Sequence, residues 1–273
     1  MEETRIADWD DAYANGAHID GAAEYPPRWA AAAAAFREGL GARAELDIAY
    51  GTEPRRTLDL FHPEGAAEGL VVFVHGGYWR AFDKSTWSHL AAGPLARGWA
   101  VVMPSYTLAP AARISTITQE AAQAIAFAAR RIPGPLRLTG HSAGGHLVTR
   151  MVCAEGPLPE EVAARVARVV SLSGVHDLRP LLRTAMNADL RLDAAEAAAE
   201  SPALRAPRAG ARLLCWVGAA ERQEFRRQNA LLANVWAGLG AATAAHEEVG
   251  KHHFDVIDGL AEPYSALTAA LLG

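Results

Sequence analysis

The stretch "LRLTGHSAGGHL", residues 136–147, constrains the fold of this chain more than any other. It begins as an apolar run typical of a strand and continues into a helix-favouring segment from Ala143 onward. Gly140, Ser142 and Gly144 stand at every second position where the two meet. Glycine permits a sharp backbone turn and a close approach of strand and helix. A strand that passes directly into a helix in this way predicts a sheet with α/β connections.

The rest of the chain repeats this alternation. Strands are predicted at 69–77, 99–106, 136–142, 166–174, 211–218 and 242–249, several of them as the near-continuous apolar runs of strands covered on both faces. Helices are predicted within 26–44, where Gly39 and Gly41 suit a C-terminal stop, and at 114–132, 143–156, 223–240 and roughly 262–272. Residues 44–50 and 56–63 predict an antiparallel pair of strands before the alternation begins. We therefore predict an α/β fold: a mostly parallel sheet, helices on both faces, and an antiparallel N-terminal edge.

One domain over residues 1–273 is predicted, because the chain shows neither an internal repeat nor an inter-domain linker. Residues 177–210 depart from the alternation. They have a mixed pattern that contains Pro180, Pro202 and Pro207. This segment predicts a cap-like excursion from the sheet within the same domain.

Composition narrows the functional classes. The chain is 51% hydrophobic and 21% charged with a net charge of −5, and it has no basic stripe, so nucleic acid is not an expected partner. The opening "MEETRIADWDDAYANG" lacks the basic end and apolar centre of a signal peptide, and no apolar stretch is long enough to span a bilayer. We expect a soluble cytoplasmic protein without a membrane partner. Cys153 and Cys215 lie in apolar runs without metal-ligand spacing, so neither predicts a metal site.

The strand–turn–helix context of Gly140-x-Ser142-x-Gly144 predicts a nucleophile elbow. The turn would lift the Ser142 hydroxyl above the carboxyl edge of the sheet, where ligands bind in open α/β sheets. A serine hydroxyl needs a base to take its proton. His252 and His253 both follow the last predicted strand, and spacing alone does not choose between them.

The other histidines are weaker candidates for the base. His246 lies within the last predicted strand. His141 and His146 flank the elbow, and we expect them to be structural or to line the pocket.

The carboxylate that orients the histidine has two candidates. Glu221 follows the strand at 211–218 on the turn before a helix, whereas Asp177 follows the preceding strand. Either could hold the imidazole tautomer and stabilise the imidazolium. Glu221 is favoured because the loop after the penultimate strand is the commoner place for this acid. A structural alternative for Asp177 is an N-cap on the next segment.

The stretch "GLVVFVHGGYWR" (69–80) ends a buried strand on a glycine-rich turn. Acyl transfer requires backbone N–H groups that receive the developing oxyanion. The N–H groups of Gly76 and Gly77, with that of Ala143 after the nucleophile, are the expected donors. Tyr78 and Trp79 are expected to stand at the pocket mouth and to suit a flat or aromatic substrate. His75 is expected to brace the loop.

The motifs "HGGYW" (75–79), "GHSAGGHL" (140–147), "EFRRQ" (224–228) and "HHF" (252–254) occur together in this chain. In this combination the chain resembles the kynurenine formamidase (arylformamidase) group of α/β-hydrolases and its bacterial esterase relatives, and the likeness runs over most of its length. The resemblance implies the α/β-hydrolase fold. It places the nucleophile on Ser142, the histidine on His253 before Phe254, and the acid on Glu221, where the formamidases usually have aspartate.

The resemblance implies hydrolysis of N-formyl-L-kynurenine to L-kynurenine and formate, a step of tryptophan catabolism, with no metal or organic cofactor. The alternative is a carboxylesterase acting on small acyl esters. The expected partner is therefore a small-molecule substrate, and the sequence also allows a homo-oligomer. A non-catalytic binding protein of this class would usually lack the serine or the histidine, and this chain has both.

Overall fold

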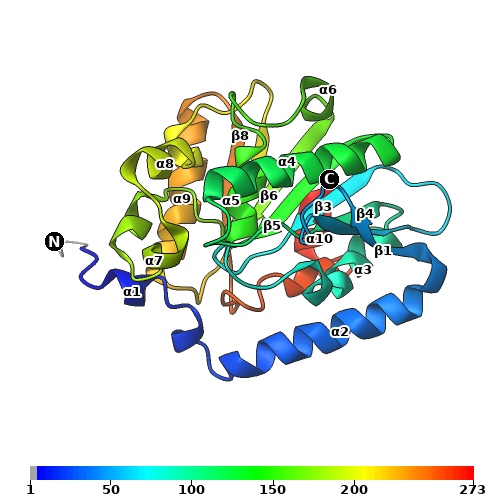
Figure 1. Ribbon diagram of the computed structural model, residues 1–273, viewed down its shortest axis with the longest axis horizontal. Helices are drawn as coiled ribbons and strands as arrows, with labels where there is room; N and C mark the ends of the chain where they lie inside the picture. The colour runs from blue at the N-terminus through cyan, green and yellow to red at the C-terminus, as the bar shows by residue number, and fades with distance from the viewer. Residues whose placement is uncertain (1–4) are drawn as a thin grey trace.

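A computed structural model describes residues 5–273 and places eight strands in one sheet, in the order β1-β2-β4-β3-β5-β6-β7-β8 (Figure 1). β2 runs antiparallel to both β1 and β4, and the strands from β4 across to β8 are mutually parallel. The predicted α/β-hydrolase architecture with an antiparallel edge is thereby confirmed. The strands are β1 Ala44–Ala49, β2 Thr57–Phe61, β3 Leu70–Val74, β4 Ala100–Pro104, β5 Leu136–His141, β6 Val166–Leu172, β7 Arg212–Gly218 and β8 Ala242–Glu248.

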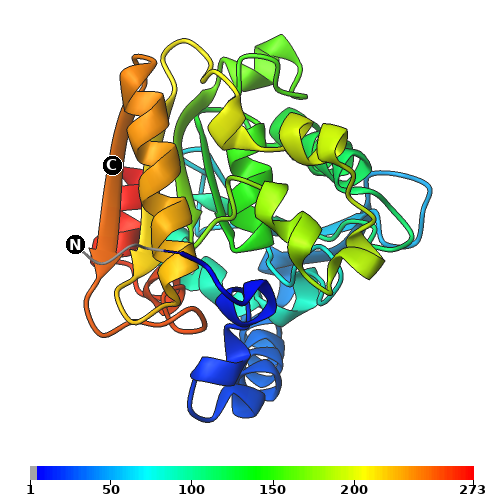
Figure 2. The ribbon, with the colours of Figure 1, turned by 90° about the vertical axis from the view of Figure 1, so that its left-hand side faces the viewer.

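Helices cover both faces of the sheet. α4, α5 and α9 pack on one face, and α2, α3 and α10 pack on the other (Figures 1 and 2). The α-helices are α1 Trp9–Ala12, α2 Tyr25–Leu40, α3 Ala92–Ala96, α4 Ile114–Arg131, α5 Ala143–Arg150, α6 Glu160–Ala163, α7 Asn187–Leu190, α8 Ala194–Ala199, α9 Gln223–Gly238 and α10 Ala266–Leu272. Short 3-10 turns are η1 Gly16–His18, η2 Ala22–Glu24, η3 Gly41–Arg43, η4 Lys84–Thr86, η5 Ser88–Ala91, η6 Arg179–Arg183, η7 Pro202–Leu204 and η8 Asp258–Ala261.

All five residues of β3 are apolar because both faces of this strand are covered by helices. Successive side chains of a strand point to opposite faces of the sheet. Leu70, Val72 and Val74 belong to the core cluster under α4, α5 and α9, whereas Val71 and Phe73 belong to the cluster under α2 and α10. All five are buried, so an uninterrupted apolar strand fits a position in the middle of a three-layer fold.

Two predicted helices have different ends in the structure. α5 ends at Arg150 instead of residue 156, because the chain then turns and Cys153 forms an isolated bridge with Pro207. α10 begins at Ala266 instead of residue 262, and Ser265 caps it by accepting the N–H of Thr268 at 3.0 Å. The sequence prediction also missed α1, α3 and α6, which are short.

The excursion of residues 177–210 carries η6, α7, α8 and η7. Arg113, which precedes α4, donates from Nε to Glu196 of α8 at 2.8 Å, and Ser115 Oγ donates to the same carboxylate at 2.7 Å. These contacts fasten the excursion to the main body. Its role as a cap within a single domain stays a prediction.

Residues 5–24, for which no structure was predicted, form α1, η1 and η2. In Figure 2 the dark blue α1 lies beside α9 and the excursion, and the turns after it lead to α2. The Tyr13 hydroxyl donates to Glu224 of α9 at 2.7 Å, and Asp10 accepts the backbone N–H of Ala185 at 2.7 Å. The N-terminal segment thus packs against the carboxyl edge of the sheet. Within residues 5–273, no helix has both the length and the apolar character that crossing a bilayer requires.

Buried neutral histidines should make stability fall with acid. Burial lowers the pKa of His146 to about 4 and that of His176 to about 3, so these folded-state values lie below the unfolded value of 6.5. Between pH 6.5 and about 4 the unfolded chain therefore binds more protons than the folded chain, and stability decreases as pH falls. Each such histidine costs about 1.4 kcal/mol per pH unit in this window.

We expect the free energy of unfolding, measured by urea denaturation at pH 7.5, 6.0 and 5.0, to fall with decreasing pH. His146→Gln should reduce this slope. If His146→Gln leaves the pH dependence of the free energy of unfolding unchanged, the attribution of this dependence to buried His146 is contradicted.

Candidate active site

Ser142 stands on a strained turn between β5 and α5. Its φ of +55° and ψ of −116° are rare for a non-glycine residue and cost about 1–3 kcal/mol. The flanking glycines are required by space: a Cβ on Gly140 would lie 2.4 Å from the carbonyl oxygen of Gly144, and a Cβ on Gly144 would lie 1.9 Å from that of Val74. The local sequence therefore folds into the sharp turn that a nucleophile elbow needs, with Ser142 lining a cavity.

His253 and Glu221 meet at the same edge of the sheet. His253 Nδ1 lies 2.6 Å from Glu221 Oε2, and both side chains are buried. The other carboxylate oxygen of Glu221 accepts hydrogen bonds from Ser173 Oγ at 2.5 Å and from the N–H of Gly218 at 2.8 Å. Because these donors fix Glu221, the carboxylate holds the Nδ1–H tautomer of His253 and leaves Nε2 free to accept a proton.

Ser142 and His253 both line this cavity. Among residues 5–273 no hydrogen bond joins Ser142 Oγ to another group. Catalytic hydrogen bonds of this kind often form only when substrate is bound.

Asp177, the rival acid, points elsewhere. Its two carboxylate oxygens pair with Nε and Nη2 of Arg179 at 2.9 and 2.8 Å. Burial opposes ionisation of Asp177, but its bonds to Arg179 more than offset burial and hold its pKa below the ordinary value. Asp177 also accepts the backbone N–H of Arg179 at 3.1 Å. The N-cap of η6 is Leu178, so the N-cap alternative for Asp177 was wrong, and the contact to Arg179 is a local turn.

The other candidate histidines have different contacts. His252 Nε2 lies 3.0 Å from the Tyr25 hydroxyl, and its Nδ1 lies 3.1 Å from Asp255. His246 packs against Trp216 with the rings tilted by 42° and their centroids 3.9 Å apart. Neither reaches the elbow.

His141 and His146, the two histidines at the elbow, serve as supports. His141 lines the cavity and donates from Nε2 to the carbonyl oxygen of His253 at 2.8 Å. Burial, aided by the neighbouring His253, lowers its pKa well below the ordinary value, so it stays neutral and braces the loop that carries His253. His146 donates from Nε2 to the carbonyl oxygen of Glu200 at 2.7 Å and does not line the cavity.

The glycine-rich loop after β3 lies directly against the elbow. A Cβ on Gly76 would lie 3.0 Å from the Cβ of Ser142 and 2.8 Å from the carbonyl oxygen of His141. Gly77 lines the cavity at a φ of +107°, and within residues 5–273 nothing accepts a hydrogen bond from its N–H. Ala143 opens α5, so its N–H has no partner inside the helix. The glycine-rich loop and the start of α5 therefore meet at Ser142, and the oxyanion role of the Gly76, Gly77 and Ala143 N–H groups stays a prediction.

Adding a methyl group at Gly76 should therefore impair catalysis. Gly76→Ala displaces the loop from the elbow, and we expect kcat to fall about a hundredfold or more, as when one oxyanion donor is lost. The control is Gly39→Ala in α2, where a Cβ meets nothing within 4 Å and helix propensity favours alanine. Steady-state kinetics on both variants test this, and near-normal kcat in Gly76→Ala would contradict it.

The prediction for Trp79 was wrong, because Trp79 is fully buried. Its ring packs edge-on against His146 at 5.1 Å, beneath the loop, so it does not line the cavity. Tyr78 does line it, and its hydroxyl donates to the carbonyl oxygen of Tyr13 at 2.6 Å. The expected bracing by His75 agrees with its contacts: its Nδ1 donates to the carbonyl oxygen of Gly76 at 2.8 Å, and its ring stacks on Tyr106.

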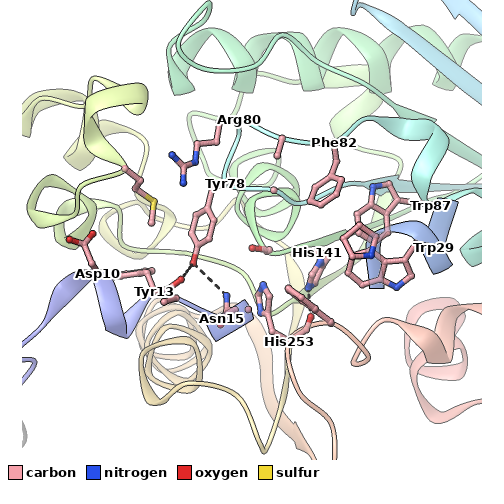
Figure 3. A pocket seen from close by; sticks show the side chains of 18 of the residues that line it. Asp10, Tyr13, Asn15, Trp29, Tyr78, Arg80, Phe82, Trp87, His141 and His253 are labelled. Carbon is pink, nitrogen blue, oxygen red and sulfur yellow. Dashed lines mark hydrogen bonds between the residues drawn. The ribbon is translucent and has the colours of Figure 1, made fainter. Parts of the chain in front are cut away.

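The cavity around Ser142 measures about 650 Å³ (Figure 3). Part of its wall comes from residues that sequence reasoning did not assign to the site. The aromatic members of this wall are Tyr13, Trp29, Phe82, Trp87 and Phe254, and the polar members are Asp10, Asn15 and Arg80. Phe254 follows His253 directly, which is a usable local signal. Asp10, Tyr13 and Asn15 reach the cavity only through the packing of the N-terminal segment.

Comparisons with known proteins agree with this architecture. Over 237 residues the chain is 27% identical to a kynurenine formamidase of Danio rerio, an alignment that covers 83% of this chain and 80% of that protein. It is 26% identical to a kynurenine formamidase of Salmo salar over 85% of this chain and 82% of that protein. A solved structure from Silicibacter sp. TM1040, described as a candidate thioesterase, is 54% identical with a TM-score of 0.93, covering 97% of this chain and 99% of that chain.

The fold and these relatives define an α/β-hydrolase similar to kynurenine formamidases, an enzyme that acts on small acyl groups. The BD-FAE family model matches residues 58–204, more than half of the chain, and the chain belongs to the BD-FAE family. The matched residues include the glycine-rich loop and the elbow with Ser142, and they end before Glu221 and His253.

Proposed function

We propose that this chain is a serine hydrolase that removes the formyl group of N-formyl-L-kynurenine to give L-kynurenine and formate. The main support for a serine mechanism is the 2.6 Å contact between His253 Nδ1 and Glu221. This contact lies at the edge of the sheet where Ser142 lines the cavity. The extended similarity to kynurenine formamidases supports this choice of substrate.

The reaction would proceed in two halves. Ser142 Oγ attacks the formyl carbon while His253 Nε2 takes the hydroxyl proton, and the N–H groups of Gly76, Gly77 and Ala143 receive the oxyanion. His253 then gives that proton to the aniline nitrogen, the C–N bond breaks, and L-kynurenine leaves. Water, deprotonated by His253, attacks the formyl ester of Ser142, and formate leaves as the serine recovers its proton.

Glu221 supports both halves without changing its own protonation. It accepts the Nδ1–H of His253 throughout and stabilises the imidazolium that forms after each proton transfer. Although formamidases usually carry aspartate here, Ser173 and Gly218 hold the longer glutamate in contact with the imidazole.

The second candidate is hydrolysis of small esters or thioesters. The 54% identical Silicibacter relative described as a candidate thioesterase favours it. The two functions share one mechanism and differ in the acyl and leaving groups.

Turnover of N-formyl-L-kynurenine beside a short-chain p-nitrophenyl ester and the corresponding thioester separates the candidates. The proposal expects the highest kcat/KM on the formamide. Turnover of the ester or the thioester without the formamide would overturn the formamidase assignment and leave the serine hydrolase mechanism in place.

A further inference from the structure

The cavity has two chemically different ends. In Figure 3, Trp29, Phe82 and Trp87 lie at one end, and Asp10 and Arg80 lie at the other, with the catalytic His253 between them. Hydrolysis of a formyl group needs neither charge. The charged end is therefore suited to contact a part of the substrate that lies away from the scissile bond.

Arg80 is held in place with most of its hydrogen-bonding capacity unused. Its Nη1 donates to Asp189 of α7 at 2.7 Å, and within residues 5–273 its guanidinium makes no other hydrogen bond. The remaining N–H groups form a planar fork that matches a carboxylate. The pair is partly exposed, with side chains 39% and 47% accessible, so it contributes little to stability.

Asp10 presents the complementary charge. One of its oxygens accepts the N–H of Ala185 at 2.7 Å, which fixes the carboxylate at the cavity wall. In the described part of the chain no cation pairs with Asp10. A fixed carboxylate without a cation is suited to an ammonium group.

We propose that Arg80 and Asp10 recognise the α-carboxylate and the α-ammonium of an amino-acid substrate, and so select substrates with a free amino-acid end. The inference rests on the proposed function and deepens it, because N-formyl-L-kynurenine carries such a group on the side chain ortho to its formamide. In Figure 3, Arg80 and Asp10 both lie on the side of the cavity away from Trp29 and Trp87, so this end presents a cation and an anion to the same bound molecule.

The first test compares N-formyl-L-kynurenine with N-(2-acetylphenyl)formamide, which keeps the formanilide and the ketone but lacks the amino acid. The readout is the ratio of the two kcat/KM values. Arg80→Gln and Asp10→Asn should each lower this ratio about ten- to a hundredfold, mainly through the KM of the amino-acid substrate, as expected for one charged hydrogen bond. Equal losses on both substrates would overturn the proposal.

A matched control separates substrate recognition by Arg80 from the structural effect of its ion pair with Asp189. Asp189→Asn removes the charge of the ion pair but keeps a side-chain oxygen that can accept the hydrogen bond from Arg80 Nη1, so the guanidinium should stay in place and the ratio should stay near the wild-type value. If Asp189→Asn lowers the ratio as much as Arg80→Gln does, the ion pair between the loop and α7 explains the effect, and the recognition proposal fails.

A second test measures ligand binding and does not depend on turnover. Ser142→Ala protein is titrated with L-kynurenine, with its analogue lacking the amino group, and with its analogue lacking the carboxylate. Arg80→Gln in this background should weaken the two carboxylate-bearing ligands and spare the third, and Asp10→Asn should weaken the two amine-bearing ligands. A uniform effect on all three ligands would overturn the inference. Selective binding without hydrolysis of any formanilide by the wild-type enzyme would overturn only the formamidase assignment.

Discussion

Replacing Ser142 by alanine should lower kcat/KM on any substrate of this enzyme by about 10⁴- to 10⁶-fold, as loss of the nucleophile does in other serine hydrolases. Alanine removes Oγ, and within residues 5–273 that oxygen makes no hydrogen bond that the fold would lose. The melting temperature should therefore change little. Steady-state kinetics and thermal unfolding of the same preparation test both statements.

The control for this variant is Ser88→Ala. Ser88 is buried but accepts a hydrogen bond from Arg37 of α2 and does not line the cavity. Its loss should affect stability more than kcat/KM. A Ser142→Ala enzyme that keeps more than a small fraction of wild-type turnover would refute the nucleophile assignment.

Glu221→Gln should lower kcat by about 10³- to 10⁴-fold, the range seen when a triad carboxylate is neutralised. Gly218 N–H and Ser173 Oγ hold one side-chain oxygen of residue 221. A glutamine would place its oxygen there and turn its NH₂ toward His253 Nδ1. That nitrogen would then have to accept, so the proton would move to Nε2, and His253 could not act as a base.

Asp177→Asn is the matched comparison, because Asp177 was the other acid that the sequence allowed. Its carboxylate binds Arg179 and lies outside the cavity around Ser142. We expect kcat within a few-fold of wild type and a modest loss of stability. Retained activity in Glu221→Gln together with a large loss in Asp177→Asn would reverse the acid assignment.

The sequence predicted best what depends on neighbouring residues. The elbow at Ser142 is defined by glycines whose Cβ atoms would collide with Val74 and with Gly144. Such constraints appear as a fixed local pattern, and the α/β alternation around them is equally local. The mostly parallel sheet followed from that alternation, and the antiparallel edge followed from the opening pair of strands. The order of the strands within the sheet was not predicted and comes from the structure.

The local sequence pattern could not decide which carboxylate contacts which histidine, because these residues are distant in the chain. Glu221 and Asp177 both follow strand ends, and only the packed structure shows which carboxylate reaches the histidine. His252 and His253 are adjacent in sequence, yet one contacts Tyr25 and the other contacts Glu221.

Side-chain direction in the glycine-rich loop was also out of reach. Tyr78 and Trp79 both adopt positive φ, at +50° and +56°, which turns the tyrosine toward the cavity and the tryptophan into the core. The N-terminal residues Asp10, Tyr13 and Asn15 carry no motif at all. They reach the cavity through hydrogen bonds to Ala185, Glu224 and Tyr78, each far away along the chain.

The most direct test of the account is stoichiometric labelling with a serine-directed fluorophosphonate, followed by peptide mass spectrometry and by assays of N-formyl-L-kynurenine hydrolysis at each level of labelling. The account predicts one adduct per chain, on Ser142, with hydrolysis lost in proportion to labelling and no adduct in Ser142→Ala. An enzyme fully labelled on Ser142 that still hydrolyses N-formyl-L-kynurenine, or an adduct on another residue that tracks the loss of activity, would contradict it.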